Sequence, residues 1–511
     1  MTEAAKRYEK LLIHRNPYTR RAEACAELTL PYLFPREGIK GDDDLPTPYQ
    51  SIGARGVNNL AAKMLLAMFP INEQIFRYMM DEAAEEELTG DPAAKGQVDT
   101  AFARIERIVT QYMEGRSLRP ALYEALRHVI LVGNVLLYVT PDGTLRVFNL
   151  RQYVTYRAPD GSPLEHIIKE SVHPDQLPTK MVAAILEEDT ENKLDADGEW
   201  AMYTHVKFRG GKWHVYQEVC GKEVPGSKGT YRKDRCPWIS LRFNRASGEH
   251  YGRSYVEEYI GDLISCDGLS QSILEGAAAS ARLIFLVNPN SSTDLDEVSS
   301  AENGTFVTGK RDDVGALQAE KAADLRVAAT EKVDIIERLS FAFLLNSAVQ
   351  RAGERVTAEE IRFVAGELEQ ALGGIYSTLA QELQLPLINV YIGQLTRKGR
   401  LPNIPAEAAT PTVVTGIEAL GRGNDLNKLM QLAQVVQSVP EGGTFVNYGE
   451  FLTRVTAAMS VNTAGLIKSA AQVEQEKAQQ MAMAMAQSAA GPVAGNLSKA
   501  ATQPTPPQPE A

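Results

Sequence analysis

The sequence has little cysteine, few aromatic residues and no long apolar segment. Its four cysteines, among 511 residues, are Cys25, Cys220, Cys236 and Cys266. Their spacing fits neither a Cys-x-x-Cys metal clip nor a dense disulfide framework. We therefore expect reduced thiols, as in a cytosolic setting.

Membrane and export signals are also missing. The apolar run from Val129 to Val139 is interrupted by Gly133 and Asn134 and is too short to cross a bilayer. Residues 1–15 form a charged amphipathic stretch without the apolar core or cleavage site of a signal peptide. We expect neither a transmembrane anchor nor export by a signal peptide.

Positive charge is scarce relative to negative charge. The chain has 53 Lys and Arg residues against 65 Asp and Glu residues, a formal net charge of −12. This balance argues against a protein that binds nucleic acid through general positive charge. With 44% hydrophobic and 23% charged residues, the composition is that of a globular protein, and the length allows three or four domains.

Common catalytic motifs are absent: the sequence contains no Gly-x-x-x-x-Gly-Lys-Ser/Thr, His-Glu-x-x-His or Gly-x-Ser-x-Gly. Gly421-Arg422-Gly423-Asn424 resembles the start of a phosphate loop, but no β-rich run precedes it, so we interpret it as a turn between helices. The histidines lack metal-ligand spacing, and His205 and His214 are expected to face each other across a hairpin on a solvated sheet. Asp42-Asp43-Asp44 is interpreted as a solvated loop rather than a cation site. We predict no catalytic residue, no metal site and no cofactor, although sequence alone leaves open a triad built from distant segments.

The first quarter of the chain predicts helices separated by loops. Asn16-Pro17 and Thr47-Pro48 each place a capping residue before a proline, which favours a helix start. We expect helices near residues 2–14, 17–30, 48–68, 93–114 and 118–133.

From Asn134 to about Phe243 the apolar pattern has a period of two, which predicts an antiparallel sheet. Turn signals are Pro141-Asp142-Gly143 and Pro159-Asp160-Gly161, and Arg209-Gly210-Gly211-Lys212 predicts a further hairpin. A polar helix is expected near 174–188, followed by a loop rich in Glu and Asp.

Apolar residues at helical spacing predict two long helices, 253–282 and 324–345. They bracket an insert with β-like pieces at 283–287 and 305–308, so the arrangement predicts a stalk with a tip.

A capping box at 357–360 starts a third long helix, whose apolar stripe continues past Pro386 to Leu395. The pair Gly373-Gly374 predicts a bend or close packing, or is simply tolerated in a well-packed helix. Residues 400–470 are expected to form a small helical region, and the Pro-rich end after Gly491 is expected to be disordered.

Acidic residues outnumber basic residues on both stalk helices. The first has five acidic residues against two arginines, and the second has four against three basic residues, giving net charges of −3 and −1. The simpler alternative is a pair of solvated helix faces. The acidic residues that we single out are Glu257, Glu258, Asp262, Asp267, Glu275, Glu331, Asp334 and Glu337.

Six ungapped strings are specific enough to suggest a family. They are SIGARGVNNLA at 51–61, GNVLLY at 133–138, YGRSYVEEY at 251–259, LSFAFLLNSAVQR at 339–351, GERVTAEEIR at 353–362 and QELQLPL at 381–387. In these strings the sequence resembles the portal protein, or head-to-tail connector, family of short-tailed bacteriophages of the autographivirus type. The resemblance covers the chain to about residue 470, and the loop around 185–200 and the tail after 470 depart from it.

The resemblance implies an α+β, mainly helical portal fold, assembled as a ring of twelve subunits around a central channel for double-stranded DNA. It implies a wing at 1–252, a first stem helix at 253–283, a clip at 284–323 and a second stem helix at 324–345. It then implies a tunnel loop at 346–356, a long wing-to-crown helix at 357–399, a crown at 400–485 and a disordered tail at 486–511.

The resemblance also implies a non-enzymatic role. The ring would lie at the portal vertex of the virion after assembly in the host cytoplasm, and DNA would enter during packaging and leave during ejection. The implied partners are the terminase large subunit, tail adaptor proteins, the major capsid protein, the scaffold and internal core proteins, and no membrane is implied. The alternatives are a helical scaffold or adaptor without a DNA channel, or a hydrolase with a dispersed site.

The implied ring gives the charged residues specific roles. Twelve copies with −4 on each stalk give −48, a surface to which a DNA duplex would adhere weakly. Arg351 and Arg355, with Gln350 and Glu354, are candidates for contact with DNA phosphates in the tunnel loop; the alternative for each arginine is a salt bridge to a neighbouring glutamate. In the clip, the candidates for docking the motor and tail are Asn288, Asn290, Lys310 and Arg311.

Overall fold

The chain falls into two units, Met1–Ile417 and Glu418–Ala511. The computed structural model describes residues 3–39, 43–70, 74–81, 92–188, 198–281, 284–290, 293–317, 322–345, 358–402, 404, 409–413, 430–436, 438, 451–452, 455, 479 and 481. In the second unit, residues 430–436 are helical, and most of the predicted crown lies outside the described residues. The fold of the first unit is α+β and mainly helical, as expected.

Within the described residues, the helices before residue 134 are α1 (Glu3–Glu27), α2 (Ile52–Met68), α4 (Pro92–Glu114) and α5 (Leu118–Val132). The prediction of a break at Asn16-Pro17 was wrong, because α1 continues through Pro17. One buried stripe, which includes Tyr8, Leu11 and Ala22, runs along α1 on both sides of the proline. This stripe packs on α5 and on the sheet, and its burial offsets the cost of a proline inside a helix, about 3 kcal/mol.

Two antiparallel sheets follow, as predicted. The smaller has the order β10 (Trp238–Arg242), β2 (Asn134–Val139), β3 (Leu145–Phe148). The larger has the order β4 (Tyr153–Arg157), β5 (Pro163–Val172), β6 (Trp200–Arg209), β7 (Lys212–Val219), β8 (Lys222–Glu223), and β9 (Gly229–Arg232) also pairs with β7. The predicted hairpin is confirmed by the pairing of Arg209 with Lys212. The polar helix predicted between β5 and β6 is a 3₁₀ turn (Pro174–Gln176) followed by α6 (Thr179–Glu188).

A further pair of strands was not predicted. β1 (Phe76–Met80) pairs antiparallel with β13 (Ala409–Val413), which lies far away in sequence. The expectation of a purely helical region at 400–470 is therefore wrong at 409–413. Pairing over this sequence distance leaves no local signal.

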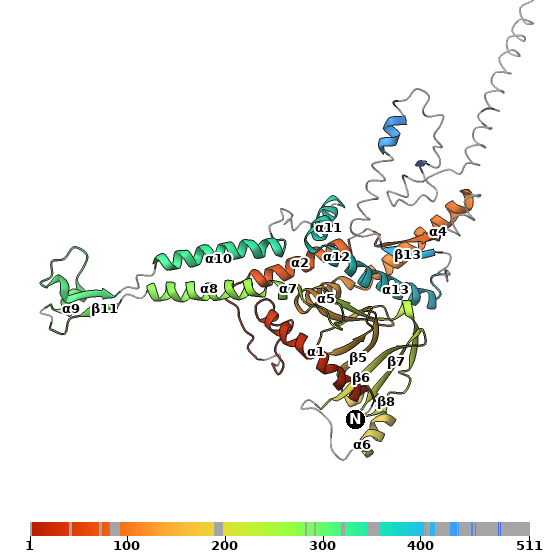
Figure 1. The fold of residues 1–511 in the computed structure, drawn as a ribbon, viewed down its shortest axis with the longest axis horizontal. Helices are drawn as coiled ribbons and strands as arrows, with labels where there is room; N and C mark the ends of the chain where they lie inside the picture. Colours follow the sequence, from red (N-terminus) through yellow and green to blue (C-terminus); the bar gives the residue numbers. More distant parts are fainter. Residues whose placement is uncertain are drawn as a thin grey trace, which may run out of the picture. The chain divides into compact units, whose positions relative to one another are not determined.

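The stalk forms as predicted, as two long helices around an insert. The helices are α8 (Ile260–Ser280), preceded by the short α7 (Tyr255–Glu258), and α10 (Ala322–Ala342), and Figure 1 shows α8 and α10 side by side. The insert contains β11 (Ile284–Val287), α9 (Leu295–Ser300), a 3₁₀ turn (Arg311–Asp313) and β12 (Val314–Leu317). The β-like piece predicted at 305–308 was wrong: β11 pairs with β12, and Phe306 is fully exposed.

The third long helix is broken into α11 (Ala358–Leu372), α12 (Gly374–Leu379), a π-helical turn (Ala380–Gln384) and α13 (Leu385–Arg397). Gly373 has φ +55°, a left-handed conformation that ends α11. No atom lies within 4 Å of a Cβ built on either glycine of the pair. Of the alternatives for Gly373-Gly374, the bend is the one that forms.

The four cysteines form no disulfide bond with one another. Burial raises the pKa of the Cys25 and Cys236 thiols to about 12, so both are protonated and unreactive. No helix in the described ranges combines the length and apolar character that a bilayer crossing requires.

Candidate functional site

Two of the strings singled out in the sequence meet at the junction between α5 and the stalk. The Asn134 side chain donates to the Gly252 carbonyl and accepts from the Gly252 N–H, both at 2.7 Å. Gly133 ends α5 with φ +79°, and a Cβ there would lie 2.6 Å from the Arg253 carbonyl carbon. Glycine is required at this position by both its conformation and this close approach.

The junction also includes the end of α10. The Tyr255 hydroxyl donates to the Ala342 carbonyl at 2.8 Å, and burial raises the pKa of Tyr255, so this donor stays protonated. The Tyr255 and Tyr259 rings lie 5.8 and 5.9 Å from the Phe343 ring. A Cβ on Gly56 of α2 would lie 2.5 Å from that ring, so the glycine allows Phe343 to pack on α2. Residues from four strings therefore fix the base of the stalk.

The stalk helices bury only one narrow seam. Leu263 and Cys266 of α8 and Ile335 and Leu339 of α10 are buried. Large apolar side chains elsewhere on the two helices are exposed, by 56% to 78%: Ile264, Leu274, Val327, Val333 and Phe341. The pair therefore presents apolar surface that this chain does not cover.

Four of the predicted acidic stalk residues are already engaged with other parts of the chain. Glu257 forms ion pairs with Arg21 at 3.2 Å and Arg253 at 3.7 Å, and Glu258 accepts a hydrogen bond from Asn244 at 3.0 Å. In α8, Asp262 forms an ion pair with Arg338 of α10 at 3.0 Å. Asp267 accepts from the backbone N–H of Gln50 at 3.2 Å. These contacts tie the stalk to the rest of the unit.

The other four, Glu275, Glu331, Asp334 and Glu337, are exposed. Glu275 accepts a hydrogen bond from Gln271 at 2.8 Å, one turn earlier on the same helix. Glu331, Asp334 and Glu337 share the exposed face of α10 with Val333 and Phe341. Helical spacing alone did not separate these residues from the engaged group, because it does not show what packs against each face.

Three of the predicted clip residues are brought together in the insert. The Asn288 N–H donates to the Asp313 carbonyl at 3.0 Å, and the Asn290 N–H donates to the Asn288 side chain at 3.1 Å. The Lys310 N–H donates to the Thr293 hydroxyl at 3.2 Å, and this hydroxyl donates to the buried Asp313 carboxylate at 2.7 Å. Sequence reasoning missed Thr293 and Asp313, which organise the group.

The remaining predicted residues lie within or close to segments that fall outside the described residues. Arg311 starts the 3₁₀ turn beside Asp313. The tunnel-loop candidates Gln350, Arg351, Glu354 and Arg355 lie outside the described residues, as does the segment 421–424. Asp43 and Asp44 are exposed, as expected of a solvated loop.

The expectation for His205 was wrong. Opposite His205 in the sheet lies Tyr216, and His205 is buried, while His214 lies opposite Lys207 and is exposed. The His205 ring bonds Glu165 at 2.7 Å and the Tyr216 hydroxyl at 2.9 Å, and Arg7 of α1 pairs with the same carboxylate at 2.8 Å. Although burial opposes ionisation, the hydrogen bonds from His205 and Arg7 lower the pKa of Glu165 to about 2.

This cluster fastens α1 to the sheet, which is a structural task. Across the residues that the structure describes, no group of three or more His, Cys, Asp or Glu side chains is arranged to hold a metal ion.

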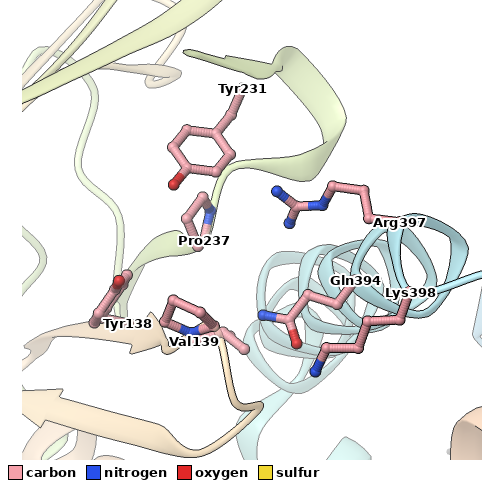
Figure 2. A pocket seen from close by; sticks show the side chains of 8 residues that line it. Tyr138, Val139, Tyr231, Pro237, Gln394, Arg397 and Lys398 are labelled. Atoms are coloured by element: carbon pink, nitrogen blue, oxygen red, sulfur yellow. The ribbon is translucent and has the colours of Figure 1, made fainter. Parts of the chain in front are cut away.

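A pocket of about 220 Å³ lies between the sheets and α13 (Figure 2). Three of its polar side chains are engaged within the chain. Lys398 donates to the Tyr112 hydroxyl at 2.9 Å, Gln394 to the Thr140 carbonyl at 2.8 Å and Arg397 to the Gly393 carbonyl at 3.3 Å. These contacts join the end of α13 to the turn after β2, through Gln394, and to α4, through Lys398. Its lining is Tyr138, Val139, Pro141, Tyr231, Pro237, Gln394, Arg397 and Lys398.

The family model and the curated relatives indicate one family. A family model described as bacteriophage head to tail connecting protein matches residues 1–467. The portal protein of Escherichia phage T7 is 42% identical over 507 residues, covering 97% of this chain and 94% of that protein. That of Enterobacteria phage T3 is 42% identical over 468 residues, covering 90% and 87%. Among solved structures, the neck of an empty GTA particle computed with C6 symmetry has a TM-score of 0.38 at 12% identity, covering 81% of this chain and 90% of that chain.

Proposed function

Because the chain belongs to the family of bacteriophage head-to-tail connecting proteins, the podovirus portal proteins, we propose that twelve copies form a ring around a channel for double-stranded DNA. The family membership confirms the resemblance in the six strings, and the function as a portal protein follows from it. In the proposed ring, DNA enters during packaging and leaves during ejection.

The observation that carries the proposal is the mixed surface of the stalk. Exposed apolar residues such as Ile264, Leu274 and Val327 suit contact with a neighbouring copy, because burying them removes apolar area from water. A head-to-tail contact of this kind closes into a ring when each copy is rotated by the right fraction of a turn.

The exposed acidic residues suit the lining of a DNA channel. Glu275, Glu331, Asp334 and Glu337 are exposed carboxylates, and Glu275 also accepts a hydrogen bond from Gln271. Repulsion between these carboxylates and DNA phosphates keeps adhesion weak, so a duplex can slide. Contact is reserved in this proposal for Arg351 and Arg355, with Gln350 and Glu354 beside them.

The proposed regions follow the expected boundaries: a wing at 1–252, stem helices at 253–283 and 324–345, a clip at 284–323, a tunnel loop at 346–356, a wing-to-crown helix at 357–399, a crown at 400–485 and a tail at 486–511. Asn288, Asn290, Lys310 and Arg311 in the clip would dock the terminase large subunit and later the tail adaptor proteins. The major capsid protein, the scaffold and internal core proteins complete the proposed partners.

In this proposal the ring assembles in the host cytoplasm and occupies the portal vertex of the virion. It hydrolyses nothing itself, and the ATP chemistry of packaging belongs to the terminase.

The mass and symmetry of the purified assembly test the ring. Native mass spectrometry should give twelve subunits, and end-on electron micrographs should show a closed annulus with an open centre. A stable monomer under all assembly conditions would contradict the proposal.

The roles of the two arginines are tested by replacing both Arg351 and Arg355 with glutamate. The rings should remain intact, while DNA packaging or retention should be impaired, because like charges would then face the phosphates. Normal packaging by this double variant would refute the assignment of a DNA contact to the tunnel loop.

A further inference from the structure

The end of α10 is held in a turn that leucine rarely adopts. Leu344 has φ +55°, in the left-handed region. The Leu344 N–H donates to Phe341 at 3.2 Å and the Leu345 N–H donates to Ser340 at 2.8 Å, the two bonds of a Schellman cap. Glycine is usual at this position, because a Cβ comes too close to the following carbonyl. Outside contacts must therefore help to hold this end of the helix.

Two side chains of α2 provide such contacts. Asn59 donates to the carbonyls of Phe343 and Leu344, both at 3.0 Å, and the Lys63 ammonium donates to the Leu344 carbonyl at 2.8 Å. Asn59 and Lys63 are one turn apart on α2, so they face the same way. A cation at a helix C-terminus also interacts favourably with the helix dipole.

The same ammonium also contacts α11, the helix that follows the tunnel-loop segment in the sequence. Lys63 lies 2.9 Å from the carboxylate of Glu367 on α11, and Lys63 itself is buried, with 8% exposure. Leu344 is at the end of α10, and α11 begins at Ala358. One buried charge therefore joins the two elements that flank the twelve residues from 346 to 357.

We propose that Lys63 is a positioning residue: through Leu344 and Glu367 it holds the end of α10 and the helix α11 in place, and so fixes the two flanks of the segment that carries Arg351 and Arg355 in the sequence. The link to DNA rests on the function proposed above, whereas the joining of the two flanks does not. A lysine that served only to stabilise α2 would affect the whole unit rather than this segment.

Trypsin tests the idea because Arg351 and Arg355 are themselves cleavage sites. Assembled Lys63→Met protein is digested under native conditions and the cut sites are quantified by mass spectrometry. Loss of the clamp should raise cleavage at Arg351 and Arg355 about tenfold, because proteolysis follows the population of the opened segment. Cleavage at Arg209, the exposed last residue of β6, should stay at the wild-type rate.

Matched variants define the controls. Lys398→Met removes a lysine that bonds Tyr112 elsewhere in the unit, and it should leave cleavage at Arg351 and Arg355 unchanged. Glu367→Gln removes only the charge on the α11 side, should raise cleavage about threefold, and carries the test if Lys63→Met does not assemble.

Unchanged cleavage at Arg351 and Arg355 in folded Lys63→Met would overturn the proposal, as would an equal increase at Arg209. A packaging assay separates this inference from the proposed function. If Lys63→Met shows the selective increase while the Arg351/Arg355 double variant packages DNA normally, the clamp stands and the DNA role of the arginines fails.

Discussion

The region around the sheets and the stalk differ in how far their apolar side chains are buried within the chain. Leu126, Ile130 and Leu136, on α5 and β2, are fully buried in a core built from many elements. On the stalk, Ile264 and Phe341 are 56% and 78% exposed. The first region is stabilised by contacts within one chain, whereas the stalk presents exposed apolar side chains, which in the proposed ring a neighbouring copy would cover. Intrachain stability and assembly should therefore separate under mutation.

The largest expected effect comes from a cavity in the core. Leu136→Ala should lower the free energy of unfolding by about 2–5 kcal/mol, because it removes buried methyl groups. Urea titration followed by tryptophan fluorescence measures this, since Trp200, Trp213 and Trp238 all lie on sheet strands. The control, Ile264→Ala on the stalk, should change that free energy by less than about 0.5 kcal/mol but weaken ring formation. Similar losses of unfolding free energy in both variants would contradict the proposed difference between the buried core and the exposed stalk surface.

The next effect concerns an ion pair that fastens α1 to the sheet. Arg7→Met should lower the free energy of unfolding by about 2 kcal/mol, because Glu165 is buried and loses a charged partner. The same urea titration applies. Lys212→Met, at an exposed position on the same sheet, serves as the control and should have little effect. A neutral result for Arg7→Met would mean that the remaining partners, His205 and Lys207, satisfy the carboxylate.

In both regions, the sequence predicted the helices and strands well where residues close together in sequence determine the structure. The helix expected to end at 133 and the strand expected from Asn134 both form, and the left-handed Gly133 ends the helix between them. The stalk helices and their insert followed from spacing alone.

The sequence was least informative where contacts between residues that are distant in sequence determine the local structure. Burial of one face of α1 outweighs the tendency of Pro17 to end a helix. Likewise, β1 pairs with β13, which lies more than 300 residues away in the sequence. Equally, nothing local to Glu257 or Asp267 shows that Arg21 and Gln50 reach them. The family was recognisable from ungapped strings, although the division of the acidic residues into engaged and exposed groups required the fold.

A pH titration should sharpen the comparison, because buried histidines occur in the sheet region. Burial, with Arg157 nearby, lowers the pKa of His166 from 6.5 to about 3, and burial lowers that of His128 to about 4. The unfolded chain binds these protons below pH 6.5, whereas the folded chain binds them only near the lowered values. The free energy of unfolding therefore has its full value above about pH 6.5. It falls as the pH decreases towards 4, by about 1.4 kcal/mol per pH unit for each histidine.

His166→Gln should remove about half of this slope between pH 6 and 5, measured by urea titration at each pH. The exposed His214 on the same sheet provides the control, and His214→Gln should leave the slope unchanged. An unaltered slope in the His166 variant would show that other groups set the acid response.

The smallest effect is expected for an ion pair of the stalk. Arg338 and Asp262 join α10 to α8 at 3.0 Å, with side chains 60% and 32% exposed. Water and salt screen such a pair, so Arg338→Met should change the free energy of unfolding by less than about 1 kcal/mol, in contrast to Arg7→Met. Unfolding of the stalk is measured by circular dichroism at 222 nm in low and high salt, and high salt should remove any remaining difference between variant and wild type. A loss as large as that of Arg7→Met would mean that the pair is shielded from water, as it would be at a contact between copies in the proposed ring. The test should therefore be made on both the monomer and the assembled ring, and an effect confined to the ring would place Arg338 at a contact between copies.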